Sequence, residues 1–273
     1  MTGKQHTHSF IKMHGLGNDF AIFDARESGL EMFEARARAL SDRRRGIGCD
    51  QLIVLRNSAA ADVFMEIWNA DGSRVGACGN ATRCVGQLIL GETGNPQIGI
   101  ETDAGLLSAV AAGSLISVNM GPAGTDWDAI PVARETDTSA ADFACGPLSA
   151  PGLVNMGNPH AVFFVDEVTA VNLETLGPKI EHDPFFPERA NISIVQATGT
   201  TLRQRVWERG AGITEACGSA ACASVVAATR KGLIDRKATV ALDGGELEVE
   251  WLADGTVQMT GPATFVFEGE AVL

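Results

Sequence analysis

Two stretches of this chain, one in each half, follow a single pattern. Residues 67–80 read IWNADGSRVGACGN and residues 206–219 read VWERGAGITEACGS, which aligns Cys78 with Cys217. Further matches occur in almost the same register: GNDFAIFD (17–24) over GNPHAVFF (157–164), and DQLIVL (50–55) over ANISIV (190–195). Several matches in nearly one register indicate an internal duplication, so we expect two halves of similar fold. The glycine and proline of MGPAGTDW (120–127) predict a break between them near residue 121.

Composition narrows the class of protein. The 273 residues are 45% hydrophobic and 20% charged, as in soluble globular proteins. A net charge of −13 repels phosphate backbones and anionic membranes, so we expect neither nucleic acid nor membrane as a partner. No apolar stretch is long enough to span a bilayer, and the segment 1–20 lacks the apolar core of a secretory signal. A cytoplasmic location is therefore expected.

Hydrophobic periodicity predicts mostly strands. Residues 31–41 form an amphipathic helical pattern, and residues 134–147 read as a surface loop. The predicted strands cover residues 51–55, 62–68, 106–110, 114–120, 201–207, 238–242 and 246–252.

Two further helices are expected directly after the aligned cysteines, with Asn80 and Ser219 as their N-caps. The segments ATRCVGQLIL (81–90) and AACASVVAATRKG (220–232) are apolar on nearly all sides, which is typical of buried helices. We therefore expect each half to wrap its strands around a central helix.

The six cysteines show no C-x-x-C spacing, so a zinc site is not expected. Cys49, Cys84, Cys145 and Cys222 are interpreted as small buried residues.

The other two cysteines, Cys78 and Cys217, precede the central helices. A helix dipole stabilises a thiolate at its N-terminus by about 0.3–1 kcal/mol. A thiolate is therefore expected to be accessible at neutral pH. The first backbone N–H groups of the same helices could hold a carboxylate.

If the two halves face each other, two thiols would flank one carbon. One thiolate could then remove a proton from Cα while the opposite thiol returns a proton to the other face. Donors around the carboxylate would stabilise the charge that develops on its oxygens. Such a pair suits inversion of an amino-acid stereocentre without a pyridoxal cofactor.

The motifs resemble those of the diaminopimelate epimerase family, which interconverts LL- and meso-diaminopimelate without a cofactor. The matching stretches are KMHGLGNDF (12–20), GCDQ (48–51), WNADGS…ACGN (68–80), MGNPHAV (156–162), ERANI (188–192), WERGAG (207–212) and ACGSAACA (216–223). The resemblance implies an α/β (α+β) fold of two pseudo-symmetric domains, each a mixed, mostly antiparallel sheet around a central helix. It also implies that the last strand returns to the first half, which gives domains 1–121 plus 263–273 and 122–262.

The resemblance further implies an isomerase of lysine and peptidoglycan-precursor biosynthesis that acts on a small molecule, needs no cofactor or metal, and forms a homodimer. The catalytic residues it implies are Cys78 and Cys217 as acid/base thiols, with His160 and Glu208 tuning their protonation. The substrate-binding residues it implies are Asn18, Gln51, Asn69, Gly79, Asn80, Asn158, Asn191, Glu208, Arg209, Gly218 and Ser219. Departures from the family pattern at Ala81, Thr82 and Ala220 are expected to tighten the pocket.

Three alternatives remain open at this point. A proline or hydroxyproline racemase would use the same two thiols, but those enzymes resemble CGH where this chain has Asn80, and Glu208 with Arg209 suits a substrate with a second charged end. A cysteine-nucleophile hydrolase would use Cys217 with His160. A non-catalytic module would bind small amino acids without exchanging their Cα proton.

Overall fold

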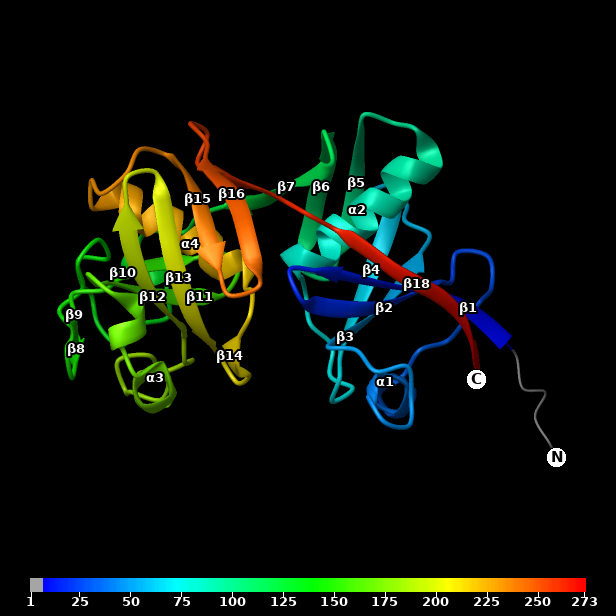
Figure 1. Cartoon of the computed structure of the whole chain (residues 1–273), viewed down its shortest axis with the longest axis horizontal. Coiled ribbons are helices and arrows are strands. Elements are labelled where there is room, and N and C mark those ends of the chain that lie inside the picture. The colour runs from blue at the N-terminus through cyan, green and yellow to red at the C-terminus, as the bar shows by residue number, and fades with distance from the viewer. Residues whose placement is uncertain (1–6) are drawn as a thin grey trace. The chain divides into compact units, whose positions relative to one another are not determined.

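The computed structural model describes residues 7–273 and divides the chain into two compact units (Figure 1). The first unit comprises Met1–Val118 and Gly261–Leu273, and the second comprises Asn119–Thr260. Residues 1–6, which begin the segment expected to lack a secretory signal, lie outside the described part. The chain leaves the first unit within a strand, β7, and returns within another, β17.

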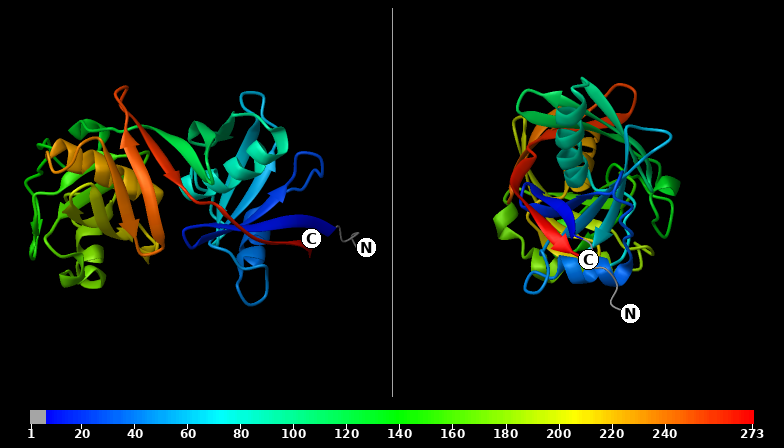
Figure 2. Two further views of the ribbon diagram at one scale, coloured as in Figure 1. Left: turned by 45° about the horizontal axis from the view of Figure 1, so that its top comes forward. Right: turned by 90° about the vertical axis from the view of Figure 1, so that its right-hand side faces the viewer.

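The first unit is a mixed sheet with two helices. Its strands run in the order β18-β1-β2-β3-β4-β5-β6-β7, with parallel pairs β2–β3 and β4–β5. The β18–β1, β1–β2, β3–β4 and β5–β6 pairs are antiparallel. Its elements are β1 (Thr7–Gly15), β2 (Asn18–Asp24), α1 (Glu34–Ser41), β3 (Gln51–Arg56), β4 (Val63–Asn69), α2 (Gly79–Thr93), β5 (Gln97–Thr102), β6 (Gly105–Ala112), β7 (Leu115–Pro122) and β18 (Thr264–Val272). Figure 2 shows β18, in red, running beside β1, in blue.

The second unit repeats this succession of strands. Its order is β10-β11-β12-β13-β15-β16-β17, again with two parallel pairs, β11–β12 and β13–β15. Its elements are η1 (Trp127–Ala129), β8 (Ala144–Cys145), β9 (Leu148–Ser149), β10 (Gly152–Asn155), β11 (Pro159–Phe164), η2 (Val168–Ala170), α3 (Leu173–Glu181), β12 (Asn191–Thr198), β13 (Thr201–Glu208), β14 (Gly212–Thr214), α4 (Gly218–Arg230), β15 (Lys237–Leu242), β16 (Gly245–Trp251) and β17 (Thr256–Gly261). The matching topology confirms the predicted pseudo-symmetric halves.

Each unit packs its strands against one buried helix. In α2 the first eight residues are all buried, and the helix contacts β1, β5 and β6. In α4 every residue from Ala220 to Ala228 is buried, and the helix contacts β10, β13 and β16 among others. A Cβ atom on Gly86 would lie 2.9 Å from that of Ala109, so α2 approaches β6 as closely as a glycine permits. The mixed α+β fold with central helices is confirmed.

Helix α1 begins later than the sequence predicted, at Glu34 instead of Glu31. Its N-cap is Phe33, and the residues expected to form its first turn are not helical; Met32 among them and Leu30 just before them are buried. Burial of these two side chains in the core therefore outweighs the local helical pattern.

We predict that Ile89→Ala in α2 destabilises the protein by about 2–5 kcal/mol, because truncation of a buried isoleucine leaves a cavity. Ile89 is 1% exposed. The midpoint of guanidinium unfolding measures this loss. Leu88→Ala is the matched control, because Leu88 is only half-buried and should cost less. Equal costs for the two variants would contradict the burial of one face of α2.

Candidate active site

The cysteines themselves occupy the N-cap positions of the two central helices. Cys78 and Cys217 have extended backbones, with φ of −148° and −126°, and the helices begin at Gly79 and Gly218. The prediction that Asn80 and Ser219 are the caps is therefore wrong, because each helix starts earlier than its polar residue. Both thiols lie at the positive end of a helix dipole.

The residues that depart from the family pattern are buried in the cores of their units. Ala81, Thr82 and Ala220 are all 0% exposed. The Thr82 hydroxyl donates a hydrogen bond to the Cys78 carbonyl at 2.8 Å, within the first turn of α2. This contact ties Thr82 to the backbone that carries the thiol.

In the first unit, Asn18 lies against the thiol. Its Oδ1 atom is 3.8 Å from Cys78 Sγ and accepts a hydrogen bond from Asn80 Nδ2 at 3.2 Å. The side chains of Asn18, at the start of β2, and of Cys78 and Asn80, at the start of α2, thus meet at one point.

Gln51 and Asn69 form a second pair in the same unit. They are cross-strand neighbours at the ends of β3 and β4, and Gln51 Nε2 donates to Asn69 Oδ1 at 3.0 Å. Gln51 Oε1 is buried and accepts no hydrogen bond from any residue that the structure describes. Such an oxygen suits a donor from a ligand, for example an ammonium group.

In the second unit, Cys217 is buried beside a carboxylate. Burial and the negative charge of Glu208 raise the pKa of the Cys217 thiol well above its ordinary value. Ser219, whose hydroxyl is 3.5 Å from the sulfur, and the Ala220 N–H act in the opposite direction. The expectation of an accessible thiolate is therefore wrong for Cys217 in the free protein, because desolvation outweighs the helix dipole.

His160 lies wholly inside the second unit. Burial, followed by the positive charge of Arg209, lowers the pKa of His160 to about 3, so the ring is neutral at pH 7. Its Nε2 atom lies 2.8 Å from Asn158 Oδ1. An amide oxygen only accepts hydrogen bonds, so Nε2 carries the proton. His160 thus fixes the orientation of the Asn158 amide.

Asn191 supports the segment that carries Arg209. It is 2% exposed, and its Oδ1 accepts a hydrogen bond from the Arg209 backbone N–H at 3.0 Å. Its Nδ2 donates to the Pro159 carbonyl. The Arg209 guanidinium is exposed and donates to the Glu188 carbonyl at 3.1 Å.

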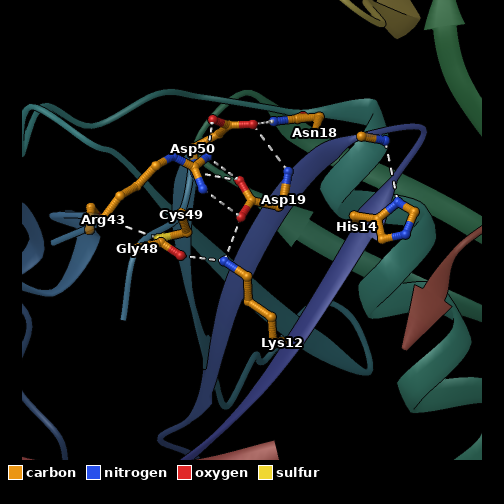
Figure 3. Close-up of polar contacts among 10 residues, drawn as sticks. Lys12, His14, Asn18, Asp19, Arg43, Gly48, Cys49 and Asp50 are labelled. Atoms are coloured by element: carbon orange, nitrogen blue, oxygen red, sulfur yellow. Dashed lines mark hydrogen bonds and ion pairs between the residues drawn. The ribbon is translucent and has the colours of Figure 1, made fainter. Parts of the chain in front are cut away.

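Two carboxylates beside these groups were missed by the sequence analysis. Asp50 accepts a hydrogen bond from the Asn18 side chain (Figure 3). Glu181, 2% exposed, accepts from the Trp207 indole at 2.7 Å and from the Gly210 N–H at 2.9 Å, and so holds the turn after β13. Asp50 lies inside the GCDQ stretch, which could have indicated it, whereas Glu181 carries no local signal.

Each unit therefore holds one thiol at the start of a buried helix, beside asparagine side chains in the first unit and beside Ser219 and Glu208 in the second. That combination can bind a carboxylate and move a proton. Among residues 7–273 no group of three or more His, Cys, Asp or Glu side chains is arranged to bind a metal ion. Over the same range no helix is both long and apolar enough to cross a membrane.

Solved structures with this fold include distant proteins. A Bacillus anthracis phenazine biosynthesis protein of the PhzF family matches with a TM-score of 0.68 at 17% identity, covering 98% of this chain and 100% of that chain. A hydroxyproline epimerase from Agrobacterium vitis, solved with trans-4-hydroxy-L-proline, matches with a TM-score of 0.68 at 15% identity, covering 100% of this chain and 93% of that chain. At these identities the likeness concerns the fold alone.

Sequence relatives are much closer. The family model described as diaminopimelate epimerase matches residues 10–125 and 152–266. The diaminopimelate epimerase of Rhodospirillum centenum is 52% identical over 96% of this chain and 91% of its own length. That of Sphingopyxis alaskensis is 53% identical over 96% of both chains. The match covers both halves of the duplication, and in each half a cysteine precedes a buried helix. This chain therefore belongs to the diaminopimelate epimerase family.

Proposed function

We propose that Cys78 and Cys217 interconvert LL- and meso-diaminopimelate by acting as acid and base on one substrate carbon. The chain is an isomerase of the diaminopimelate epimerase family, whose reaction belongs to lysine biosynthesis. The observation that carries the assignment of the thiols is their identical placement, at the N-cap of the buried helix in each half of a duplicated chain.

The proton moves between the thiols through the substrate. In the LL-to-meso direction Cys217, as thiolate, takes the Cα proton, and the electron pair left on carbon is delocalised into the substrate carboxylate. The Cys78 thiol then gives a proton to the opposite face, leaving a thiolate at Cys78. The N–H groups at Gly79–Asn80 and Gly218–Ser219 bind the carboxylate on which charge develops.

Cys217 must first give its own proton to solvent, and Cys78, left as a thiolate after turnover, must take one back from solvent. Glu208, hydrogen-bonded to the thiol, holds the protonated form in the free protein. A substrate ammonium placed near both groups would offset the charge of Glu208 and favour the thiolate. Glu208 thus sets when Cys217 becomes a base, and neutral His160 fixes the orientation of the Asn158 amide.

The remaining residues bind the two amino-acid ends of the substrate. The amide oxygens of Gln51, Asn69 and Asn158 suit an ammonium group. The Arg209 guanidinium can bind the distal carboxylate with two parallel hydrogen bonds. Asn191 supports it by holding the Arg209 backbone. The second charged end distinguishes this substrate from proline, which has none to offer Arg209.

We further propose a cytoplasmic homodimer formed through β18. This strand ends the sheet order, and Phe265, Val266 and Phe267 on it are 51%, 49% and 45% exposed. An edge strand with unpaired backbone groups and apolar side chains is a natural surface for a second copy.

We predict that Cys78→Ala and Cys217→Ala each lower turnover by about 100-fold or more, because inversion needs both an acid and a base. Proton NMR of LL-diaminopimelate in deuterated water follows loss of the Cα signal and appearance of the meso isomer. Cys145→Ala, in the β8–β9 hairpin, is the control and should leave the loss of the Cα signal and the appearance of the meso isomer unchanged.

The rival functions give different results in that assay. A hydrolase acting through Cys217 alone would keep its activity in Cys78→Ala. A proline racemase would exchange the Cα proton of proline instead, and a binding module would exchange none. Any of these outcomes would overturn the proposal.

Glu208→Gln should shift the pH profile of Cys217 alkylation to lower pH, because the substitution removes a negative charge that raises the pKa of this thiol. Iodoacetamide labelling of the Cys217 peptide, followed by mass spectrometry over a pH series, measures the shift. Cys84, whose pKa burial raises to about 12, is the internal control and should not respond. A profile unmoved by the substitution would remove Glu208 from the control of the thiol.

Phe265→Glu should convert the dimer to a monomer in light scattering after gel filtration, because it places a charge in the proposed interface. Leu233→Glu is the matched control, since Leu233 is 45% exposed but lies in the second unit, outside β18. A wild-type chain that elutes as a monomer would contradict the dimer directly.

A further inference from the structure

The Asp50 carboxylate belongs to a polar network in the first unit that also contains Asn18, Asp19 and Arg43 (Figure 3). Its Oδ2 accepts hydrogen bonds from Asn18 Nδ2 and from the Asp19 backbone N–H, both at 3.1 Å. Its Oδ1 accepts from Arg43 Nη2 at 2.7 Å. Both oxygens are thus engaged by donors from three other residues.

This arrangement permits only one orientation of the Asn18 amide. An ionised carboxylate accepts hydrogen bonds and donates none, so the NH2 group must face Asp50. The amide is planar, and its oxygen must therefore face the other way. On that side it lies 3.8 Å from Cys78 Sγ and 3.2 Å from Asn80 Nδ2.

We propose that Asp50 is a positioning residue: it locks the Asn18 amide with its oxygen toward Cys78 and thereby keeps that thiol protonated. An acceptor beside a thiol binds the S–H form, whereas an amide N–H would bind the thiolate. Cys78 is thus held ready as the proton donor. The inference rests on the proposed role of Cys78 as an acid.

The Asp50 carboxylate is itself held in place by a second set of charged side chains. The Arg43 guanidinium bridges Asp50 and Asp19, and the Asp50 N–H returns a hydrogen bond to Asp19 Oδ1 at 2.9 Å. Lys12 pairs with Asp19 and also donates to the Gly48 carbonyl. A Cβ at Gly48, where φ is +76°, would lie 2.8 Å from the Arg43 Cα. Glycine at this position therefore allows the Arg43 segment to lie this close.

Asp19 remains ionised throughout the working pH range. Burial raises its pKa, but hydrogen bonds from Arg43 and Lys12 outweigh burial and bring the value to about 2. A permanent anion at Asp19 fixes Arg43, and Arg43 in turn fixes Asp50.

The second unit lacks this arrangement. When GNDFAIFD is aligned with GNPHAVFF and DQLIVL with ANISIV, Ala190 corresponds to Asp50 and His160 to Phe20. In the second unit the oxygen of Asn158 is turned to the His160 ring, 2.8 Å away. Equivalent asparagines are therefore oriented by different partners, a carboxylate in one unit and an imidazole in the other. The carboxylate that orients Asn18 toward Cys78 therefore has no counterpart at the aligned position of the second unit.

The test measures the pH dependence of Cys78 alkylation in Asp50→Ala. Without the carboxylate, the Asn18 amide can turn an N–H to the sulfur and favour the thiolate. The loss of one hydrogen bond to the protonated form should raise the labelling rate at pH 7 by about two- to tenfold. The limb of the pH–rate profile that reports Cys78 should move to lower pH by the corresponding amount, about 0.3–1 pH unit.

A double-mutant cycle distinguishes an effect of Asp50 through Asn18 from a general disturbance of the first unit. If Asp50 acts through Asn18, adding Asp50→Ala to Asn18→Ala should change the Cys78 profile no further. Asp62→Ala is the matched control, since Asp62 also accepts a backbone N–H, from Gly99 at 2.7 Å, but lies outside the network. Additive effects of the two substitutions would overturn the proposal.

Asp50→Asn covers the case in which the alanine variant does not fold. Asparagine keeps the shape of the aspartate side chain, but its NH2 group must face one of the three donors that Asp50 accepts from. The Cys78 alkylation profile should therefore shift in the same direction as in Asp50→Ala, by a smaller amount. An unchanged Cys78 profile in this variant would refute the role of Asp50. Because labelling does not depend on turnover, that result is distinct from retained activity in Cys78→Ala, which would instead refute the proposed function.

Discussion

Burial of a helix that is apolar on nearly every side is the constraint on which each unit depends. Once α2 and α4 are enclosed by strands, their first turns are the part that carries the polar groups of the site. An extended cysteine directly before each helix puts sulfur at that point. The same enclosure removes water from the thiol, and for Cys217 this desolvation dominates the field of the helix.

The duplication, the central helices and seven strands could be predicted because their patterns are local. Alternating segments such as β16 and β13 show their exposed and buried faces directly in the sequence. Strands β1 and β18 were not found by periodicity. Lys12 and His14 interrupt the apolar pattern of β1, and β18 is exposed along most of its length. The return of β18 to the first unit came from family resemblance alone.

The site could be predicted as a set of residues but not as a set of contacts. Asn18, Gln51 and Asn69 stand at strand ends, and only pairing shows which of them meet. Nothing in the sequence distinguishes Arg43 from the other arginines of its run, yet in the structure it donates to the carboxylates of both Asp19 and Asp50. The raised pKa of Cys217 was beyond the sequence too, because the degree of burial and the approach of Glu208 are properties of the folded chain.

The two crossings within β7 and β17 make the second unit an insertion in the first. Residues 119–260 are contiguous, so the second unit is built from a single segment of the chain. The first unit is assembled from two segments, because β1 pairs with β18 from the far side of the second unit in the sequence. A cut in the chain before β18 would therefore leave the strands of the second unit complete but expose the edge of β1 in the first.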